Sequence, residues 1–368
     1  MKNNLKNTYA VIMAGGIGSR FWPTSRETKP KQFLDILGTN KTLLQTTYNR
    51  FKNFLPKENI IIVTLEKYKH FVKDQLPNLP QENILGEPEG KNTGLSICYV
   101  THKLYKKSKE IDVIIAPADH LILGEIEFIN TCRKTLRSDE LKKNIFTIGI
   151  KPHMPHTGYG YIEFKKIKSE QIFDVSKFIE KPNLEKAKQF YLSKKYLWNA
   201  GIFISNIEVL MEAFRQTSSK INNQFEKNKN YFDTKKEFEA LTTIYKNLES
   251  VSFDYAVLEK AKNIKVVKAS FEWSDLGSWT SIYNLSKKDE NRNALIGDKI
   301  FTNDSFSNLI KVPNKKLAFI QGLHDYIIID TEDALLICKT ENEQKIKEYI
   351  TEIKKTNQKE YCAGFNFT

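Results

Sequence analysis

The chain has 368 residues with 57 Lys and Arg against 44 Asp and Glu, which gives a formal net charge of +13. This length predicts two domains, and the positive charge favours anionic ligands. A nucleic-acid partner is disfavoured because the lysines are spread over helix-like surface segments, such as residues 105–109 and 226–230, and no recognition motif is present.

Cysteine use and hydropathy indicate a cytoplasmic protein. The four cysteines form no C-x-x-C pair and do not resemble a disulfide framework, so a reducing compartment is expected: Cys98, Cys132, Cys338 and Cys362. The basic start has no apolar segment behind it, and no apolar stretch reaches about 18 residues. We therefore expect no export signal and no membrane partner.

A strand-length apolar run at residues 9–14 leads into a loop rich in glycine and basic residues. Glycines let backbone N–H groups approach a ligand closely, so the loop predicts a phosphate site. The dinucleotide fingerprint fails because its third glycine would be Phe21, and the Walker sequence Gly-Lys-Ser/Thr is absent. The loop contains Gly15, Gly16, Gly18, Arg20, Arg26, Lys29 and Lys31.

The next hundred residues alternate between helices and buried strands. We expect helices at 42–54, 66–75 and 93–106, and strands at 60–63, 83–86 and 112–116, the last ending in Pro117-Ala118-Asp119-His120. This alternation predicts right-handed βαβ units in a mostly parallel sheet. Ligands bind at the carboxyl ends of such strands, so the glycine loop and Asp119 should converge.

Longer excursions separate the strands of the next part, which we interpret as the substrate-facing half of the same domain. Strands are expected at 146–150, 160–164, 175–179 and 201–204, and helices at about 184–194, 206–216, 234–248 and 253–262. Short β segments then run from 294 to 338, before a charged helix at about 341–355. We expect a catalytic domain at 1–288 and a small β-rich domain at 289–368.

Two aspartates are candidate metal ligands. Asp119 follows a strand, and Asp275 lies in the glycine turn of residues 273–279. One or two carboxylates together with substrate phosphates are the usual ligands of Mg²⁺. Taken singly, an Asp at a strand end is more often a helix N-cap or a turn residue. His120 is given no role, and His153 and His156 lack the partners of a zinc site.

The run from Gly15 to Phe33 resembles the sugar-nucleotide pyrophosphorylases, in the form found in the mannose-1-phosphate guanylyltransferase branch. The likeness continues through residues 117–120, 180–182, 198–203 and 273–279, and it spans Tyr9 to about Ile350. It implies an α/β, Rossmann-like (GT-A-like) nucleotidyltransferase domain with a mostly parallel sheet. It also implies a small C-terminal β-rich domain, which in relatives is a short left-handed β-helix; no clean repeat marks one here.

The resemblance assigns roles to particular residues. Arg20, Lys31, Asp119, Lys181 and Asp275 are implied to be catalytic, with Asp119 and Asp275 holding Mg²⁺. The sugar phosphate is implied to contact Gly160, Glu180, Lys181 and Asn199. Residues implied to bind the nucleotide are Ala14, Gly15, Gly16, Gly18, Ser19, Arg20, Lys31, Asn92, Thr93, Pro117 and Asp119.

The implied reaction converts GTP and α-D-mannose 1-phosphate into GDP-mannose and pyrophosphate. A sugar phosphate oxygen is already anionic, so positioning and charge neutralisation supply most of the catalysis. A single activity is expected, and a homodimer is left open. The alternatives are another sugar phosphate or nucleotide, or a non-catalytic regulatory homologue. The nucleobase is left open, because Lys91, Gly94, Leu95 and His156 stand where relatives usually have Arg, Ala, Pro and Glu.

Overall fold

The computed structural model describes residues 5–16, 18–165, 171–356 and 360–363. They form two compact units, each assembled from separate stretches of sequence. The first unit contains Met1–Gly15, Thr47–Ala118 and Ile122–Trp273, and the second contains Gly16–Thr46, Asp119–Leu121 and Ser274–Thr368. The glycine-rich loop thus belongs to the same unit as the C-terminal strands. The domains expected at 1–288 and 289–368 are, by contrast, continuous segments of sequence.

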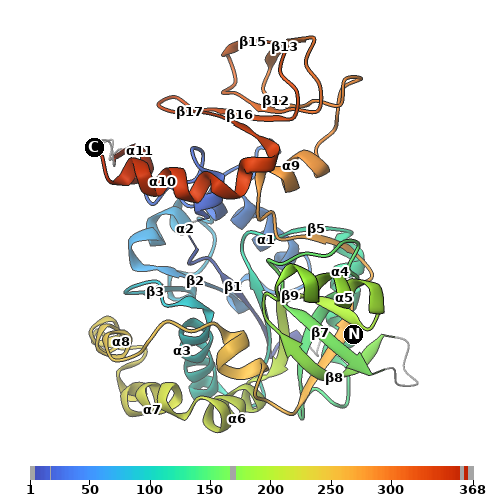
Figure 1. Ribbon diagram of the computed structural model, residues 1–368. Coiled ribbons are helices and arrows are strands. Elements are labelled where there is room, and N and C mark those ends of the chain that lie inside the picture. The colour runs from blue at the N-terminus through green and yellow to red at the C-terminus, as the bar shows by residue number, and fades with distance from the viewer. Residues whose placement is uncertain (1–4, 17, 166–170, 357–359, 364–368) are drawn as a thin grey trace. The chain divides into compact units, whose positions relative to one another are not determined.

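A sheet of nine strands among the described residues is the centre of the first unit, in the order β3-β2-β1-β4-β9-β6-β10-β8-β7 (Figure 1). The expected parallel arrangement holds for β3, β2, β1 and β4. Beyond β4 the sheet is mixed, because β9 runs antiparallel to both β4 and β6. The strands are β1 (Thr8–Met13), β2 (Ile60–Leu65), β3 (Ile84–Glu87), β4 (Asp112–Pro117), β6 (Ile145–Ile150), β7 (Tyr161–Lys165), β8 (Ile172–Ile179), β9 (Tyr196–Asn206) and β10 (Ile264–Lys268).

Helices of the first unit follow the predicted alternation in its N-terminal half. Two helices, α4 and α7, are additional to those expected, and the helix expected at 253–262 is a single π-helical turn, Asp254–Leu258. The α-helices are α2 (Lys69–Gln75), α3 (Asn92–Lys107), α4 (Glu125–Leu136), α5 (Leu184–Ser193), α6 (Ile207–Thr217), α7 (Ser219–Asn228) and α8 (Glu237–Lys246). Unit boundaries fall inside or beside three further elements, α1 (Leu43–Lys52), β5 (Leu121–Leu123) and β11 (Glu272–Ser274).

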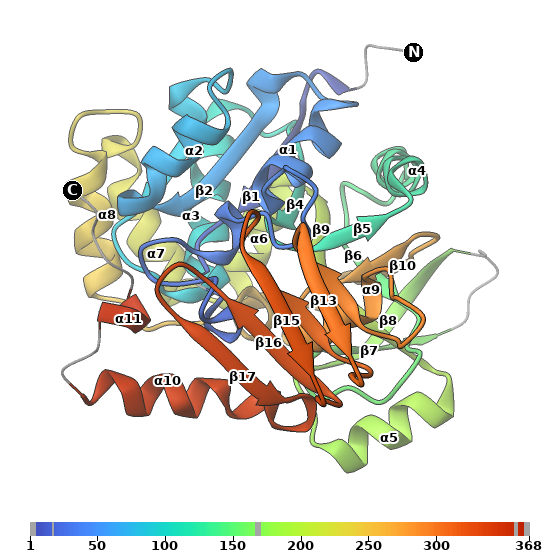
Figure 2. The same cartoon turned by 90° about the horizontal axis from the view of Figure 1, so that it is seen from above.

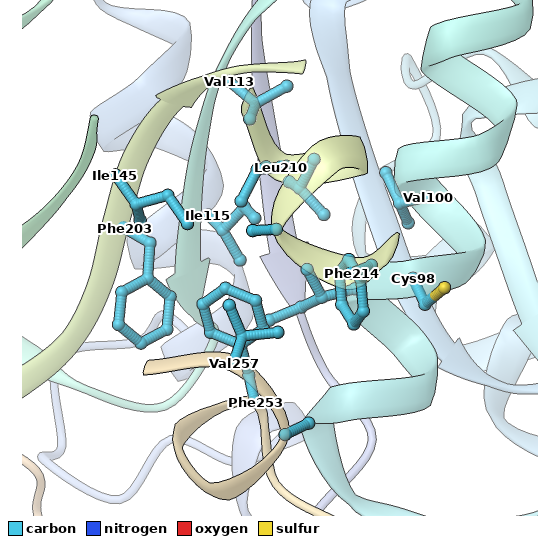
Figure 3. Close-up of a cluster of buried hydrophobic side chains, with 14 of the residues drawn as sticks. Cys98, Val100, Val113, Ile115, Ile145, Phe203, Leu210, Phe214, Phe253 and Val257 are labelled. Carbon is cyan, nitrogen blue, oxygen red and sulfur yellow. The ribbon is translucent and has the colours of Figure 1, made fainter. Parts of the chain in front are cut away.

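The core of the first unit lies between the sheet and α3, α6 and the π-helical turn. Figure 3 shows Val113 and Ile115 of β4 in one cluster with Phe203 of β9, Phe214 and Phe253. These strands are continuous apolar runs because both of their faces are covered. Burial of this cluster fixes the carboxyl ends of the parallel strands, where site residues are expected.

The second unit joins the glycine-rich loop to short β-strands that stack in parallel (Figure 2). Ala294 pairs with Leu309, and Leu309 pairs with Ile327, so successive turns of chain lie in register. A stack of parallel coils of this kind is the arrangement of a β-helix. The strands are β12 (Ala294–Ile296), β13 (Lys299–Asn303), β14 (Leu309–Lys311), β15 (Leu317–Gln321), β16 (Tyr326–Asp330) and β17 (Leu335–Lys339), and the helices are α9 (Trp279–Leu285), α10 (Ile346–Lys354) and α11 (Glu360–Ala363).

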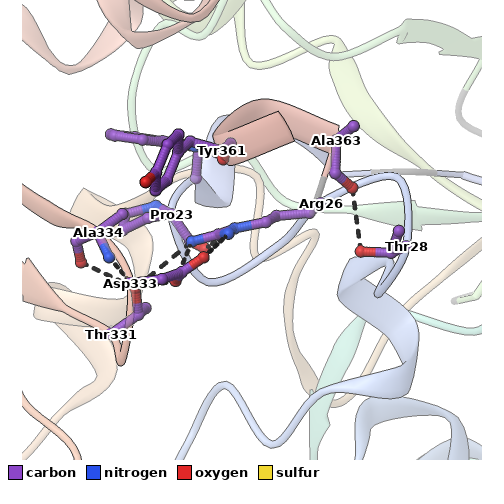
Figure 4. A network of polar contacts seen from close by, with 9 residues as sticks. Pro23, Arg26, Thr28, Thr331, Asp333, Ala334, Tyr361 and Ala363 are labelled. Atoms are coloured by element: carbon purple, nitrogen blue, oxygen red, sulfur yellow. Dashed lines mark hydrogen bonds and ion pairs between the residues drawn. The ribbon is translucent and has the colours of Figure 1, made fainter. Parts of the chain in front are cut away.

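Buried polar and apolar contacts bind the loop to the C-terminal segments of the second unit. Phe21 packs edge-on against the fully buried Trp279, with ring centres 4.9 Å apart. Arg26, which is 8% exposed, pairs with Asp333, and its Nε donates to the backbone oxygen of Pro23 (Figure 4). Thr28 donates through Oγ1 to the backbone oxygen of Ala363 at 3.0 Å. The loop is therefore held by residues that follow it by about 250 positions or more.

None of the described helices is both long and apolar enough to cross a membrane.

Candidate active site

In the second unit, the glycine-rich loop is shaped by a close approach between Gly18 and Lys31. Gly18 has φ = +72°, a conformation that residues with a side chain rarely adopt, and it precedes the 3₁₀ turn Ser19–Phe21. A Cβ atom on Gly18 would lie 2.4 Å from Cβ of Lys31. Glycine is therefore required for the loop to close on this lysine.

Lys31 is buried, with 3% of the residue exposed, and its ammonium group has two oxygen acceptors. Nζ donates to Asp119 Oδ2 at 3.0 Å and to the backbone oxygen of Asp275 at 2.9 Å. It also lies 5.1 Å from the centre of the Phe21 ring. One cation thus joins three stretches of sequence that are far apart along the chain.

A cavity of about 290 Å³ opens beside this cation. It brings together six of the predicted residues, namely Gly18, Ser19, Arg20, Lys31, Asp119 and Asp275, and it is also lined by Phe21, His120, Gly277 and Lys347. Lys347 comes from α10 and was not predicted, because a lysine in a charged helix ordinarily faces solvent. Burial and the charge of Arg20 lower the pKa of Lys347. Three cations beside two carboxylates suit a polyphosphate.

The two carboxylates of this cavity have different surroundings. Burial raises the pKa of Asp119, but the positive charges of Lys31 and His120 and the hydrogen bond from Lys31 outweigh it and hold the pKa below its ordinary value. Asp275 accepts through Oδ1 from the backbone N–H of Gly277 at 3.0 Å. A Cβ on Gly277 would lie 2.4 Å from Asp275 Oδ2, so glycine is required at this turn.

The donor set of the cavity fits Mg²⁺. No group of three or more His, Cys, Asp or Glu side chains that could hold a metal occurs among the described residues. Mg²⁺ does not need such a cage, because it is normally held by one or two carboxylates together with substrate phosphates and water. Asp119 and Asp275, both lining the same cavity, supply that number.

In the first unit, the predicted sugar-side residues meet at one place. A Cβ on Gly160 would lie 2.5 Å from Glu180 Oε2, and the backbone N–H of Asn199 donates to the backbone oxygen of Gly160 at 2.8 Å. The Glu180 side chain is 8% exposed and pairs with Lys181, whose side chain is 59% exposed. Lys181 has φ = +45°, an unusual backbone for a residue with a side chain.

The Asn199 side chain has protein partners at both ends. Oδ1 accepts from Thr147 Oγ1 at 2.8 Å and from the backbone N–H of Gly201 at 3.1 Å, while Nδ2 donates to Asp254 Oδ1 at 2.9 Å. Burial and the charge of Glu180 raise the pKa of Asp254 to about 6. Neither Thr147 nor Asp254 was predicted, since an isolated Thr in a strand and an Asp at a helix start have ordinary structural explanations.

A buried carboxyl group lies at the end of β3. Glu87 is 3% exposed, and its Oε1 accepts from Ser96 Oγ at 2.6 Å and from the hydroxyl of Tyr245. Its Oε2 lies 3.6 Å from the position of a Cβ on Gly15. Burial raises the pKa of Glu87 to about 7. The carboxyl ends of parallel strands β1 and β3 thus bring Glu87 toward Gly15, a contact absent from the sequence-based set.

The start of α3 contains the predicted base-side residues. Asn92 has φ = +64° and accepts through Oδ1 from the N–H of Thr93, while Thr93 Oγ1 accepts from the N–H of Phe253 at 2.9 Å. Lys91 Nζ donates to the backbone oxygens of Tyr245 and Leu248. Asn92 Oδ1, Thr93 Oγ1 and Lys91 Nζ therefore all form hydrogen bonds to other groups of the protein. Two other predicted residues, Ala14 and Pro117, lie at the ends of β1 and β4, and Gly16 is exposed.

Two family models match the chain. The one described as Nucleotidyl transferase matches residues 9–292, and the one described as MannoseP isomerase/GMP-like beta-helix domain matches residues 299–353. The second match agrees with the parallel stacking of β12 to β16.

Curated relatives and a solved structure cover nearly the whole chain. A mannose-1-phosphate guanylyltransferase of Escherichia coli is 34% identical over 363 residues, covering 95% of this chain and 76% of the relative. Mannose-1-phosphate guanylyltransferase RfbM of Salmonella typhimurium is 33% identical over 358 residues, with 95% and 73% covered. The crystal structure of a mannose-1-phosphate geranyltransferase from Thermus thermophilus superposes with a TM-score of 0.84 at 25% identity, covering 95% of this chain and 99% of the other. The chain belongs to the mannose-1-phosphate guanylyltransferase family of nucleotidyltransferases.

Proposed function

We propose that this nucleotidyltransferase makes GDP-mannose and pyrophosphate from GTP and α-D-mannose 1-phosphate. The observation that carries the proposal is the cavity of the second unit, where Gly18 permits the approach of Lys31, and Arg20, Lys31 and Lys347 gather beside Asp119 and Asp275. The names of the relatives agree with this reaction.

The reaction needs little proton transfer from the protein. A phosphate oxygen of mannose 1-phosphate bonds to the α-phosphorus of GTP, and the bond from that phosphorus to the bridging oxygen breaks, releasing pyrophosphate. Arg20 and Lys31 neutralise the triphosphate and the negative charge that grows on the leaving group, and Lys181 binds the phosphate of the incoming sugar. The Lys181 side chain is 59% exposed, so its ammonium group can exchange Glu180 for an anionic ligand.

Mg²⁺ is proposed as the cofactor, with Asp119 and Asp275 as its protein ligands. When bound, the ion would neutralise phosphate charge beyond what the lysines and arginine supply. Because Asp119 also accepts from Lys31, the same carboxylate orients a cation that faces the triphosphate.

The environment of Glu87 supports guanine as the base. Guanine presents N1–H and a 2-amino group, two neighbouring donors that the two lone pairs of Glu87 Oε2 can accept from together, since Oε1 already accepts from Ser96 and Tyr245. Adenine lacks this pair of donors. Glu87 Oε2 faces the Gly15 turn, and the two hydroxyl donors on Oε1 fix the orientation of its carboxyl group.

Location and assembly are part of the same proposal. A cytoplasmic enzyme is supported by four cysteines that are all buried and unbridged. A homodimer is supported by apolar side chains exposed on β13 and β15, namely Phe301, Leu317 and Phe319, since subunit interfaces are rich in such residues. Light scattering of the purified protein gives the assembly state directly.

A matrix of nucleoside triphosphates against sugar 1-phosphates, read by pyrophosphate release in the presence of Mg²⁺, tests the reaction. The largest kcat/KM is expected for GTP with mannose 1-phosphate. A maximum at another pair would keep the reaction class and replace the substrates. No release with any pair, from a protein that binds GDP-mannose, would establish the regulatory alternative instead.

A further inference from the structure

Asn199 is available to a substrate as a hydrogen-bond donor but not as an acceptor. The N–H of Gly201 can only donate, so the atom that it contacts must be the amide oxygen of Asn199. That oxygen also accepts from Thr147 Oγ1, which occupies both of its lone pairs. Of the two hydrogens on Nδ2, one is directed to Asp254 Oδ1. The second N–H of Nδ2 remains for a ligand, and its direction is fixed because the first N–H is bonded to Asp254.

Asp254 is held in place from the base-side end of the same unit. The preceding residue, Phe253, is fully buried, and its N–H donates to Thr93 Oγ1 at 2.9 Å. The N–H of Gly94 donates to the backbone oxygen of Val251 at 2.9 Å. A Cβ on Gly94 would lie 2.7 Å from that oxygen, so glycine, in place of the Ala expected from the resemblance, permits the approach.

The turn that begins at Asp254 has an uncommon geometry. Residues Asp254–Leu258 form a single π-helical turn, a distortion that is frequent at functional sites. Three of these residues, Ala256, Val257 and Leu258, belong to the hydrophobic core of the unit. Asp254 therefore projects toward Asn199 from a rigid, buried support and not from a loose loop.

We propose that Asp254 is a positioning residue for sugar recognition, which orients the Asn199 amide so that its remaining N–H and the carboxylate of Glu180 together bind the sugar hydroxyl groups. The proposal rests on the proposed function and extends it to the basis of sugar choice. The donated N–H of Asn199 and the carboxylate oxygens of Glu180 must match a fixed pattern of hydroxyls. An epimer leaves at least one of these polar groups without a partner.

Substitution of Asp254 should change the kinetic constants for the sugar phosphate and leave those for GTP nearly unchanged. Asp254→Ala removes the acceptor of Asn199 Nδ2, so we expect KM for mannose 1-phosphate to rise about tenfold or more. The preference for mannose over glucose 1-phosphate, as a ratio of kcat/KM, should fall, while KM for GTP stays within about twofold. Asp254→Asn can still present an oxygen to Asn199 and should restore most of the preference. Glu259→Ala, at an exposed residue directly after the same turn, is the matched control.

A double substitution distinguishes positioning from a general structural role. If Asp254 acts through Asn199, Asp254→Ala should add little to the loss of preference already caused by Asn199→Ala. Full additivity of the two losses, or equal increases in KM for GTP and for mannose 1-phosphate, would overturn the proposal. Thermal unfolding of each variant identifies any that is misfolded. If Asp254→Ala is misfolded, the affinity of Asp254→Asn for GDP-mannose, measured by calorimetry, is compared with that of the wild type instead.

The pH dependence of the sugar constant gives a second readout. Asp254 is faced by Glu180, whose charge raises its pKa, and by Lys181 and Asn199, which lower it. Protonation near pH 6 removes the negative charge of the acceptor that orients Asn199, so KM for the sugar phosphate should rise modestly below that pH. The substrate phosphate titrates in the same region, and the comparison with Asp254→Asn isolates the protein group. Identical profiles for the two enzymes would contradict the proposal. If the wild type uses a different sugar phosphate, the proposed function fails but the same comparison applies to that sugar.

Discussion

At Gly18 the absence of one methyl group decides whether the glycine-rich loop can close on Lys31. In Gly18→Ala the new Cβ would meet Lys31 Cβ at 2.4 Å, on a backbone with φ = +72°. We expect a loss of about 1–3 kcal/mol in the free energy of unfolding and a higher KM for GTP. Gly322→Ala is the matched control, because Gly322 has a similar backbone, with φ = +75°, and a Cβ there has nothing within 4 Å. Urea unfolding and steady-state kinetics measure both effects, and equal behaviour of the two variants would refute this account of Gly18.

The two proposed metal ligands differ in what else they do. Asp119 pairs with the Lys31 ammonium through its side chain, whereas Asp275 contacts that ammonium through its backbone oxygen. Asp275→Asn therefore removes a carboxylate without leaving the buried lysine uncompensated, which makes it the cleaner variant.

We expect Asp275→Asn and Asp119→Asn each to lower kcat by more than about 100-fold at ordinary Mg²⁺. Only Asp119→Asn should also lower the melting temperature, because it leaves Lys31 with less negative charge nearby. Turnover measured over a range of Mg²⁺ concentrations tests the role in metal binding. Normal activity of either variant would remove that residue from the metal site.

At the scale of elements, Glu87 links β3 to α3 and α8 through Ser96 and Tyr245. Its pKa is raised from 4.5 to about 7 by burial. Between these two values the folded protein retains a proton that the unfolded chain has lost, so the contribution of Glu87 to stability falls as pH rises. Above about pH 7 this loss is complete, and it amounts to about 3 kcal/mol at most.

Glu87→Gln keeps an acceptor for both hydroxyls and does not titrate. We therefore expect the stability of the variant relative to wild type to increase from about pH 5 to about pH 8, as measured by urea unfolding at each pH. A relative stability that is constant with pH would mean that Glu87 titrates normally. The same variant should lose selectivity for GTP over ATP if the carboxylate contacts guanine.

The sequence predicted the parallel half of the sheet because Ile60–Val63 and Val113–Ala116 are continuous apolar runs of strand length, and such runs are characteristic of buried parallel strands. The motifs of the resemblance also supplied six of the ten residues that line the cavity of the second unit. The antiparallel pairing of β9 is a long-range choice that no local pattern encodes. α7 was missed because its sequence is mainly polar, and Asp254 because a π-helical turn has no distinct sequence signal.

At the scale of the whole molecule, the Arg26–Asp333 pair tests how the second unit holds together. Arg26 is 8% exposed, and its hydrogen bond to Asp333 lowers the pKa of that carboxyl group. Asp333→Asn should lower the free energy of unfolding by about 1.5–3 kcal/mol at neutral pH. Glu332→Gln, an exposed neighbour, should leave it unchanged.

The pH dependence of this difference has a definite sign. A depressed pKa contributes stability above the ordinary value of 3.8 and loses it as pH falls through the folded-state value. The difference in the free energy of unfolding between wild type and Asp333→Asn should therefore become smaller in strongly acidic solution. A difference that is absent at neutral pH would show that Arg26 is satisfied without Asp333.

The discontinuity of the second unit has a consequence for synthesis on the ribosome. Residues 16–46 leave the exit tunnel early, yet Phe21, Arg26 and Thr28 find their partners at Trp279, Asp333 and Ala363. Because domains tend to fold as they emerge, the first unit can collapse before the partners of Phe21, Arg26 and Thr28 have been synthesised. A nascent chain that stalls before residue 274 then carries an unfinished phosphate loop. Such a fragment would expose Phe21 and Trp22, the kind of apolar surface that chaperones and proteases recognise.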